Sequence, residues 1–395
     1  MILKYIYKDG TKKQINIKLN KKVTDKWINI TATDKLDFIK EFIPAFNSGQ
    51  KIILFDQKHK QLLEFHQKND INYLNNIEKV NKESKILFFT SGSTGFPLGA
   101  FKSKANLLNE VEILKQLLIN HEITRVVVTV PFVHIYGIIA GLLLPLSLNN
   151  IELIIKDDFL PYEVLEEASK ANTLVVTTPV FIKALARLEE TKKLNSSIFI
   201  SSTGPLDTKD ILNFESKYAT TVLQLFGSTE TGGIAYKFGT KQKWTNLDTV
   251  NISTLDDKLN VKSSFISKYI LDKNILTLKQ PFQTEDIIEK YEDGFSIIGR
   301  SNKIIKIAGK RISSLQIETI LEAIPEVQVA VVQLVYKKDL LRSEQIKITL
   351  ESKNKVSKSI IKDSISNQFG ALTIPFSIFY VDKINYSSVG KKIIF

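Results

Sequence analysis

The amino-acid sequence predicts an α/β large lobe of layered sheets and helices over residues 1–299, joined by a hinge to a small C-terminal α+β lobe over 300–395. First, short apolar, β-branched segments alternate with segments whose apolar residues repeat at helical spacing. Second, the pattern changes after about Thr231, where strands of more open sheets are expected. Third, 395 residues exceed what one small core needs, which favours two domains.

Buried strands that alternate with helices are expected in the large lobe. A short apolar strand over 85–89 precedes a glycine-rich turn, and a helix is expected after that turn, over 105–118. The further strands are expected at 125–130, 151–155, 174–177, 198–201 and 221–225, and the further helices at 137–148, 162–170, 181–191 and 208–218. Such alternation gives α/β layers, with ligands at the carboxyl ends of the strands.

Strands and helices also alternate beyond Thr231, but in a different texture. Strands are expected at 270–278, 295–298, 303–307, 327–336, 345–350 and 377–381, and helices at 315–323 and 356–369. The first of these helices stops before Pro325. The segments from residue 300 onward make up the small lobe.

The composition excludes several classes of protein. Apolar residues at 43% and charged residues at 24% are ordinary for a soluble globular chain. Without cysteine there is no disulfide, thiol nucleophile or cysteine-ligated metal. The first ten residues carry charges where a secretory signal needs an apolar core. The longest apolar stretch, 138–148, contains Pro145 and is shorter than the roughly 20 residues that span a bilayer. A cytoplasmic protein without a membrane span is expected.

The net charge of +12 is unevenly distributed. Residues 300–395 hold 16 Lys and Arg against 8 Asp and Glu, which is +8 of the total. A basic small lobe can attract an acidic partner, although lysines that merely solvate the surface are the alternative in this lysine-rich chain. Nucleic acid is not expected, because no basic helix or aromatic–basic motif accompanies the charge.

A glycine-rich turn offers hydroxyls and successive backbone N–H groups to phosphate oxygens. Its residues are Thr90, Ser91, Gly92, Ser93, Thr94 and Gly95. It is not a Walker A loop, because the Gly-Lys-Ser/Thr ending is missing. An ordinary Ser/Gly surface loop is the alternative.

A second motif, Phe226-Gly227-Ser228-Thr229-Glu230, follows the strand expected at 221–225. Phe226 can lie on a base, and Thr229 can donate to an α-phosphate. Glu230 can hold Mg²⁺, which binds through few carboxylates together with substrate phosphates. A solvated loop carboxylate is the alternative for Glu230.

The segment Thr-Ser-Gly-Ser-Thr-Gly-Phe-Pro at 90–97 resembles the phosphate loop of the adenylate-forming enzymes, which include acyl-CoA synthetases, peptide-synthetase adenylation domains and luciferases. The resemblance extends over most of the chain beyond residue 85. The family usually has a lysine directly after the proline, where this chain has Leu98. Lys102 and Lys104 are nearby candidates to replace that lysine.

The resemblance assigns roles to further residues of the large lobe. The segment 131–137 is similar to part of the acyl pocket, so His134 would line or gate it; a buried structural histidine is the alternative. The turn 202–206 resembles the one that borders adenine, although it also reads as an ordinary strand-to-helix turn. The residues implied in adenine and ribose binding here are Thr203, Gly204, Pro205, Phe226, Gly227 and Ser228. Gly232 and Gly233 would form the floor of the acyl pocket.

The resemblance continues into the hinge. Asp286 stands where the family has the aspartate of Thr-Gly-Asp, with Glu285 in place of the glycine, and would accept from the ribose hydroxyls. Arg300 would reach ribose or phosphate, and Asn302 occupies the hinge position, which is usually Asp or Lys. A surface ion pair is the alternative for Asp286 and Arg300.

The C-terminal segment 386–391 resembles the motif that delivers a catalytic lysine, here Lys391. An acid carboxylate that attacks an α-phosphate brings anions together, and a lysine that bridges both neutralises the charge that develops in the transition state. A solvent-exposed lysine near a terminus is the alternative.

The resemblance implies an acid–thiol ligase that uses ATP and Mg²⁺. A carboxylic acid would be activated as acyl-AMP with release of pyrophosphate, and a phosphopantetheine thiol of coenzyme A or a carrier protein would then take the acyl group. About 85 residues precede the phosphate loop, which suggests a small pocket for an aryl or short to medium acid. The basic small lobe favours an acidic acyl carrier protein. Because Leu98, Glu285 and Asn302 depart from the family pattern, a nucleotide-binding protein with lost or weak turnover is the alternative.

Overall fold

The structure is a computed structural model. It describes residues 2–31, 34–54, 56, 64, 80, 83–90, 98–170, 172–189, 192–194, 196–272, 274–301, 304–307, 310–336, 344–371, 374–386 and 392. The described chain falls into two compact units. The first holds the described residues of Met1–Asn251 and Val261–Phe282, and the second holds those of Ile252–Asn260 and Gln283–Ser387 together with Lys392.

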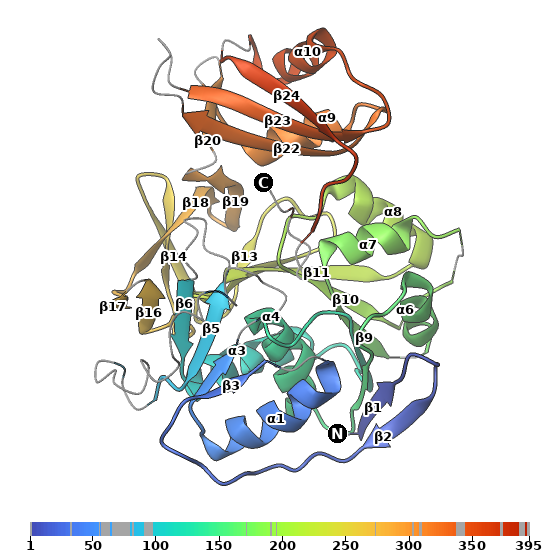
Figure 1. The fold of residues 1–395 in the computed structure, drawn as a ribbon, viewed down its shortest axis with the longest axis vertical. Helices are drawn as coiled ribbons and strands as arrows, with labels where there is room; N and C mark the ends of the chain where they lie inside the picture. Colours follow the sequence, from blue (N-terminus) through green and yellow to red (C-terminus); the bar gives the residue numbers. More distant parts are fainter. Residues whose placement is uncertain are drawn as a thin grey trace. The chain divides into compact units, whose positions relative to one another are not determined.

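A large mixed sheet is the centre of the first unit (Figure 1). Its strands, in spatial order, are β13 (Thr245–Asn246), β12 (Gly232–Phe238), β11 (Thr221–Ser228), β10 (Ile198–Ser201), β9 (Thr173–Thr177), β7 (Arg125–Val128), β8 (Glu152–Ile155), β1 (Ile2–Ile6) and β2 (Lys12–Ile15). From β11 through β1 the neighbours run parallel, and β12, β13 and β2 are antiparallel additions at the edges. Five of the six parallel strands are the buried segments expected from the sequence, and β1 was not expected.

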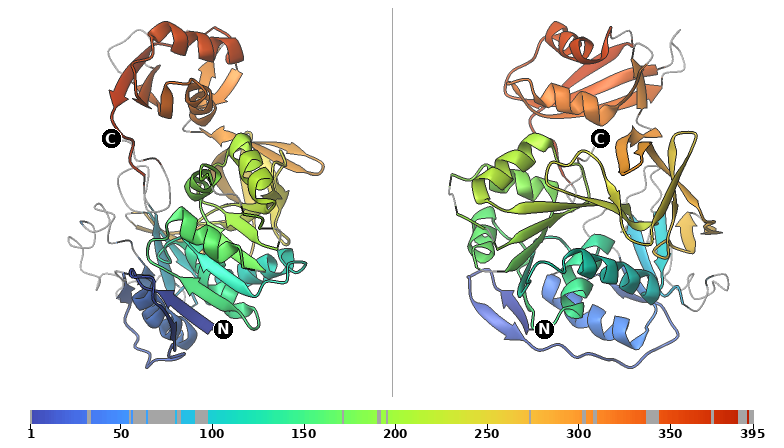
Figure 2. Two further views of the ribbon diagram at one scale, coloured as in Figure 1. Left: turned by 90° about the vertical axis from the view of Figure 1, so that its right-hand side faces the viewer. Right: turned by 180° about the vertical axis from the view of Figure 1, so that it is seen from behind.

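Alternate residues of each parallel strand enter different cores, because successive side chains point to opposite faces. In β7, Val127 packs beneath α6 (Pro161–Ala168), α7 (Pro179–Ala186) and α8 (Thr208–Tyr218). These three helices cover one face of the sheet (Figure 2). Val126 and Val128 enter the opposite core, which includes α1 (Lys35–Ser48) and α3 (Lys104–Leu117). The β-branched runs are therefore buried on both faces, as the sequence predicts.

The segment expected as one helix over 137–148 is a composite. It consists of α4 (Ile135–Ile138), a π-helical turn η2 (Ile139–Leu143) and α5 (Leu144–Ser147). A Cβ on Gly137 would lie 2.1 Å from the carbonyl oxygen of Pro131, so only glycine allows this close approach. The expected helix is thus present, with an irregular centre that its apolar pattern does not reveal.

A second sheet of the first unit shares the core that contains α1 and α3. Its order is β17 (Asn274–Thr277), β16 (Tyr269–Asp272), β6 (Leu98–Lys102), β5 (Ile86–Thr90), β4 (Ile52–Leu54) and β3 (Ile28–Ile30). The single strand expected at 270–278 is in fact the hairpin β16–β17. The strand β6 was not expected, so the glycine-rich segment joins two antiparallel strands instead of a strand and a helix.

The second unit contains the sheet β14 (Asn251–Leu255), β15 (Lys258–Lys262), β18 (Phe282–Tyr291) and β19 (Gly294–Arg300), and the pair β20 (Ile304–Ile307) and β21 (Lys310–Ser313). A further sheet has the order β22 (Val327–Tyr336), β23 (Glu344–Ser352) and β24 (Phe376–Val381). Helices α9 (Ser314–Glu322) and α10 (Lys358–Phe369) pack on its apolar face, through Ile317 and Ile361 among others. The domain boundary expected at residue 299 stays a prediction about the hinge.

Among the described residues, no helix is both long enough and apolar enough to cross a membrane.

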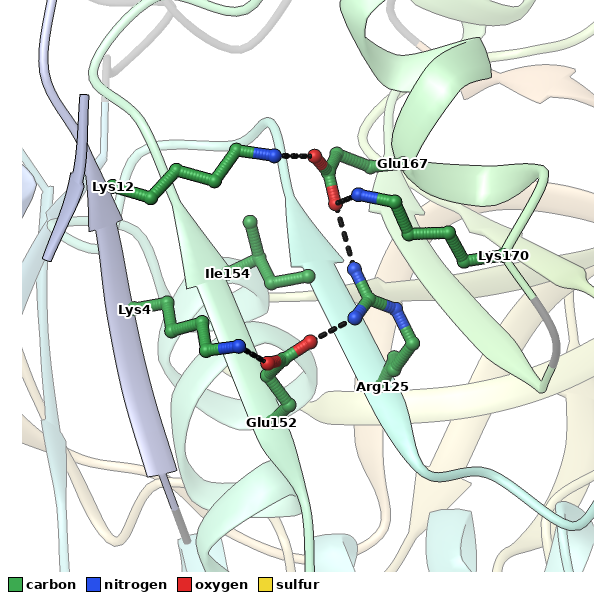
Figure 3. A pocket seen from close by; sticks show the side chains of 7 residues that line it. All are labelled: Lys4, Lys12, Arg125, Glu152, Ile154, Glu167 and Lys170. Carbon is green, nitrogen blue, oxygen red and sulfur yellow. Dashed lines mark hydrogen bonds and ion pairs between the residues drawn. The ribbon is translucent and has the colours of Figure 1, made fainter. Parts of the chain in front are cut away.

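An ion-pair network joins strands β1 and β2 of the large sheet to β8 and to helix α6 (Figure 3). Glu167, at the end of α6, contacts Lys12, Arg125 and Lys170, and its side chain is only 5% exposed. Glu152 of β8 contacts Lys4 and Arg125. Burial raises the pKa of Glu167, but hydrogen bonds from Lys12 and Lys170 outweigh it, so the pKa is lowered overall.

We expect Glu167→Gln to destabilise the protein by about 1–3 kcal/mol at neutral pH, because it weakens charge-assisted hydrogen bonds to a buried carboxylate. The folded pKa lies below the unfolded value of about 4.3, so this contribution is present above that value and is lost as pH falls through the folded pKa. Urea unfolding at pH 7 and in acid measures it, with the exposed Glu166→Gln as control. Equal losses for both variants at pH 7 would contradict the role of the network.

Candidate functional site

The expected adenine-binding segments leave neighbouring parallel strands. β10 and β11 pair in parallel, with Ser201 opposite Gln224. The turn 202–205 follows β10, and Phe226 to Ser228 form the end of β11. The hydroxyl of Ser202 donates to the carbonyl oxygen of Leu225 at 2.9 Å and so links the two segments. The structure therefore brings Thr203, Gly204, Pro205, Phe226, Gly227 and Ser228 to one edge of the sheet.

The backbone at Thr203 is unusual. Its φ is +82°, in the left-handed region that β-branched residues rarely occupy. Thr203 is half-buried, and Gly204 and Pro205 are exposed. Residues held in such conformations cluster at binding sites, which agrees with the role that the sequence gives this turn.

Phe226 lies beside an aromatic residue that the sequence reading missed. Its ring centroid is 5.6 Å from that of Trp244, at an interplanar angle of 50°. The amine of Lys237 lies over the Trp244 ring, 4.8 Å from its centroid, and burial lowers the pKa of Lys237. Phe226 is half-buried in this arrangement, so its ring orientation is set by packing.

Thr229 and Glu230 form the turn of the β11–β12 hairpin. The base of the turn is held by hydroxyls. Thr231, which is 0% exposed, accepts from the Ser228 N–H at 3.1 Å and donates to the Gly232 carbonyl oxygen at 2.8 Å. The Thr231 N–H donates to the Ser228 hydroxyl at 3.2 Å. Thr229 and Glu230 are themselves partly exposed. The turn thus presents a hydroxyl and a carboxylate from a hydrogen-bonded base.

Two buried side chains of opposite charge lie under this turn. Lys102 ends β6 and is 0% exposed; its amine donates to the carbonyl oxygens of Phe265 at 2.6 Å and Glu230 at 3.1 Å. Glu110 of α3 accepts from the Gly233 N–H at 3.0 Å. Burial lowers the pKa of Lys102, against the attraction of Glu110 and Glu230. Burial raises the pKa of Glu110, against Lys102 and the Gly233 N–H.

These contacts correct one expectation from the sequence. Lys102 was a candidate to replace the phosphate-loop lysine, but its amine is fully buried against backbone carbonyls and cannot contact a phosphate. Lys104 is exposed, with its amine 4.9 Å from the Phe46 ring centroid, so its part in phosphate binding stays a prediction.

The glycines at 232 and 233 are required by packing. Gly232 has φ +73°, and a Cβ there would lie 2.7 Å from a carboxylate oxygen of Glu110. A Cβ on Gly233 would lie 2.7 Å from Leu247 and 2.9 Å from Glu110. Their expected place in the floor of an acyl pocket stays a prediction.

His134 is the residue before α4, near the carboxyl ends of the central strands. Two residues further on, the Tyr136 hydroxyl donates to the carbonyl oxygens of Thr177 at 3.0 Å and Ile200 at 2.8 Å. These bonds hold the start of α4, and with it His134, against the ends of β9 and β10. Burial raises the pKa of Tyr136, so the hydroxyl stays a donor. His134 is half-buried, and its Nε2 lies 3.8 Å from Asp56 Oδ2. No sequence pattern pairs Asp56 with His134.

Asp286 and Arg300 lie in the second unit as direct cross-strand neighbours on β18 and β19. The Arg300 Nε is 3.9 Å from Asp286 Oδ1, and the Arg300 side chain is 53% exposed. The ion-pair alternative raised from the sequence is therefore present, and a role in ribose binding stays a prediction. Glu285, which replaces the usual glycine, contacts Lys258 and Ser301; the hydrogen bond from Ser301 contributes most to lowering its pKa.

Several predicted residues lie outside the described residues. They are Ser91, Gly92, Ser93, Thr94, Gly95, Asn302 and Lys391. The backbone of Thr90 is described and pairs with Leu98 at the base of the β5–β6 hairpin.

Lys392, the neighbour of the predicted catalytic lysine, is anchored in the second unit. Its amine contacts Glu318 at 2.8 Å, Glu322 at 2.7 Å and the carbonyl oxygen of Ala330 at 2.7 Å. Burial lowers the pKa of Lys392, but attraction to the two carboxylates outweighs it and the pKa is raised. Of the adjacent lysines at 391 and 392, the second thus has a structural role.

The described residues contain no cluster of three or more His, Asp or Glu side chains that could hold a metal ion. A Mg²⁺ that binds ATP needs few protein carboxylates, because phosphate oxygens and water molecules supply its other ligands. The partly exposed turn position of Glu230 fits that requirement.

This fold is that of the adenylate-forming enzymes. Residues 23–263 match the AMP-binding enzyme family, and the chain belongs to that family. The sequence is similar to 4-coumarate–CoA ligase of Cereibacter sphaeroides, with 27% identity over 256 residues, or 64% of this chain and 57% of the relative. It is also similar to 3,4-dihydroxybenzoate–[aryl-carrier protein] ligase of Bacillus anthracis, with 24% identity over 68% of this chain and 63% of the relative.

A solved structure with the same fold is O-succinylbenzoate coenzyme A synthetase (MenE) of Bacillus subtilis in complex with ATP and magnesium. It superposes with a TM-score of 0.75 at 17% identity, over 93% of this chain and 88% of the other. This match shows the fold class expected from the sequence. The curated relatives are matched over less than two thirds of their own length.

We expect Thr231→Val to destabilise the protein by about 1–3 kcal/mol, because it leaves the Ser228 N–H and the buried Gly232 carbonyl without this partner. The exposed Thr245→Val, on neighbouring β13, is the matched control. Denaturant midpoints measure both changes. A midpoint for the Thr231 variant equal to that of the control would show that the hydroxyl does not hold the turn.

Proposed function

We propose that this chain catalyses ATP-dependent activation of a carboxylic acid as acyl-AMP, followed by transfer of the acyl group to a phosphopantetheine thiol. The observation that carries the proposal is the common sheet edge of the turn 202–205 and the segment Phe226 to Glu230, in a member of the AMP-binding enzyme family. One edge thus carries an aromatic ring, a hydroxyl and a carboxylate suited to a base, a phosphate and a cation.

In the first half-reaction an oxygen of the acid carboxylate attacks the α-phosphorus of ATP, and pyrophosphate leaves. Phe226 would lie against the base, and the Thr229 hydroxyl would donate to the α-phosphate. Glu230 would help to hold Mg²⁺, which supplies positive charge to the phosphates. Lys391 would bridge the attacking carboxylate and the α-phosphate, where negative charge accumulates. The chain supplies alignment and charge and forms no covalent intermediate.

In the second half-reaction a thiol attacks the acyl carbonyl carbon, AMP leaves, and a thioester forms. The acceptor is coenzyme A or a carrier protein, and the two relatives named above include one ligase of each kind. The same two relatives act on 4-coumarate and 3,4-dihydroxybenzoate, which are aryl acids. We therefore propose an aryl or short to medium acid. The excess of 16 basic over 8 acidic residues in 300–395 favours an acidic carrier protein.

A second candidate is a nucleotide-binding member of the family with lost or weak turnover. It is favoured by Leu98 in place of the loop lysine, together with the burial of Lys102, which removes one replacement. Acid-dependent exchange of pyrophosphate into ATP separates the two candidates, since only an enzyme that forms acyl-AMP reversibly supports it. A panel of acids in a pyrophosphate-release assay, with and without carrier protein, would identify the substrates.

Lys391→Ala is expected to reduce acid-dependent ATP–pyrophosphate exchange by about 100-fold or more, because a charge that acts in the transition state is lost. Hydrolysis of preformed acyl-AMP should be unchanged. The control is Lys383→Ala, which removes an exposed lysine of the same unit. Exchange that survives the Lys391 substitution would contradict the assignment of the catalytic lysine.

If an acidic carrier protein is the acceptor, raising the salt concentration from about 50 to 500 mM should slow acyl transfer to the carrier steeply, because screening shortens the range of attraction between charged surfaces. Transfer to free coenzyme A should depend on salt less. Rates measured from the same acyl-AMP pool test this directly. Equal salt dependence for both acceptors would remove the charge argument for a carrier.

A further inference from the structure

The Glu230 turn is contacted by a row of polar side chains on two consecutive elements. Lys102, Asn106 and Glu110 are spaced four residues apart, from the end of β6 into α3. The Asn106 side chain donates to the carbonyl oxygen of Ser264 at 2.6 Å, beside the segment that Lys102 contacts at Phe265. The row therefore contacts both the Glu230 turn and the segment 264–267.

The contacts of the row meet at the backbone of Glu230. Its carbonyl oxygen accepts from the Lys102 amine at 3.1 Å and from the Ser267 N–H at 2.8 Å. Glu110 holds the far side of the turn through the Gly233 N–H at 3.0 Å. The residue that carries the proposed cation-binding carboxylate is thus fixed through its own main chain and through residues immediately after it.

Burial makes this arrangement costly compared with an apolar alternative. Lys102 is 0% exposed and Glu110 is 8% exposed. Two opposite charges at this depth gain little or no stability relative to well-packed apolar residues, because both charges are desolvated. The glycines at 232 and 233 also leave room for the Glu110 carboxylate. A Cβ atom at either position would lie only 2.7–2.9 Å from a carboxylate oxygen of Glu110. A role in stability alone does not account for two buried charges and for two glycines that leave room for one of them.

We propose that Lys102 and Glu110 are positioning residues that fix the Thr229–Glu230 turn in the geometry that receives the phosphates of ATP and their divalent cation. This inference rests on the proposed function of the turn. Neither side chain contacts substrate: both act through the backbone of Glu230 and Gly233. Displacement of a group that aligns reactants by about 1 Å can slow a reaction about 100-fold.

The test compares Lys102→Met with the double variant Lys102→Met/Glu110→Gln. The single variant leaves the Glu110 carboxylate buried without its counter-charge, whereas the double variant removes both charges and keeps an amide oxygen for the Gly233 N–H. The control is Lys115→Met, which removes a lysine of α3 whose side chain is 42% exposed. Thermal unfolding establishes that each variant is folded.

The main measurement is ATP–pyrophosphate exchange as a function of Mg²⁺ concentration, with KM for the acid and kcat determined separately. We expect the double variant to need at least tenfold more Mg²⁺ for half-maximal exchange and to have a kcat at least tenfold lower, with KM for the acid changed less than twofold. Lys115→Met should match the unsubstituted protein. A folded double variant with unchanged Mg²⁺ dependence and kcat would overturn the positioning role and leave the proposed function intact.

Calorimetric binding of ATP, with Mg²⁺ and with EDTA, separates failure of this inference from failure of the proposed function. If the unsubstituted protein binds ATP more tightly with Mg²⁺ but shows no exchange, the ligase is excluded, and loss of the Mg²⁺ enhancement in the double variant still supports positioning. If the double variant keeps the Mg²⁺ enhancement of ATP binding, the positioning role is overturned. If the unsubstituted protein does not bind ATP at all, both proposals are overturned.

Discussion

The site depends on the parallel pairing of β10 and β11 within a sheet that is buried on both faces. Parallel strands end at the same edge, so the segments that follow them emerge side by side. Here those segments are the turn at 202–205 and the run from Phe226, joined by the Ser202–Leu225 hydrogen bond. Apolar packing on both faces holds the strands in register, and that register determines which side chains reach the edge.

Two kinds of support act on the turn that bears Glu230. The hydroxyls of Ser228 and Thr231 close the hairpin locally, and Lys102 and Glu110 hold it from a different sheet and helix. Local hydrogen bonds shape the turn, and the distant pair sets its place relative to α3. In its proposed role beside a cation and a phosphate, the Glu230 carboxylate would need both kinds of support, because productive geometry tolerates little displacement.

Lysines take contrasting parts in this basic chain. Lys102 and Lys392 are held among carbonyls and carboxylates, and Lys4, Lys12 and Lys170 belong to the ion-pair network at the N-terminal hairpin. Net charge by itself therefore overstates how much positive surface is offered to a partner. The proposed preference for an acidic carrier rests on those lysines of residues 300–395 that do not have such structural partners.

The sequence by itself determined the family, the fold class and most strands and helices, because β-branched runs and helical apolar spacing are local patterns that burial reinforces. It also identified the motif from Phe226 to Glu230, because an aromatic ring, a hydroxyl and a carboxylate are recognised from the residue types alone. Only the tertiary structure decided the partners: Trp244 beside Phe226, Asp56 near His134, and Glu230 over Lys102. These contacts join residues far apart in the chain. A lysine in sequence carries the same charge whether it faces solvent or a buried carbonyl, so Lys102 was interpretable only once its surroundings were known.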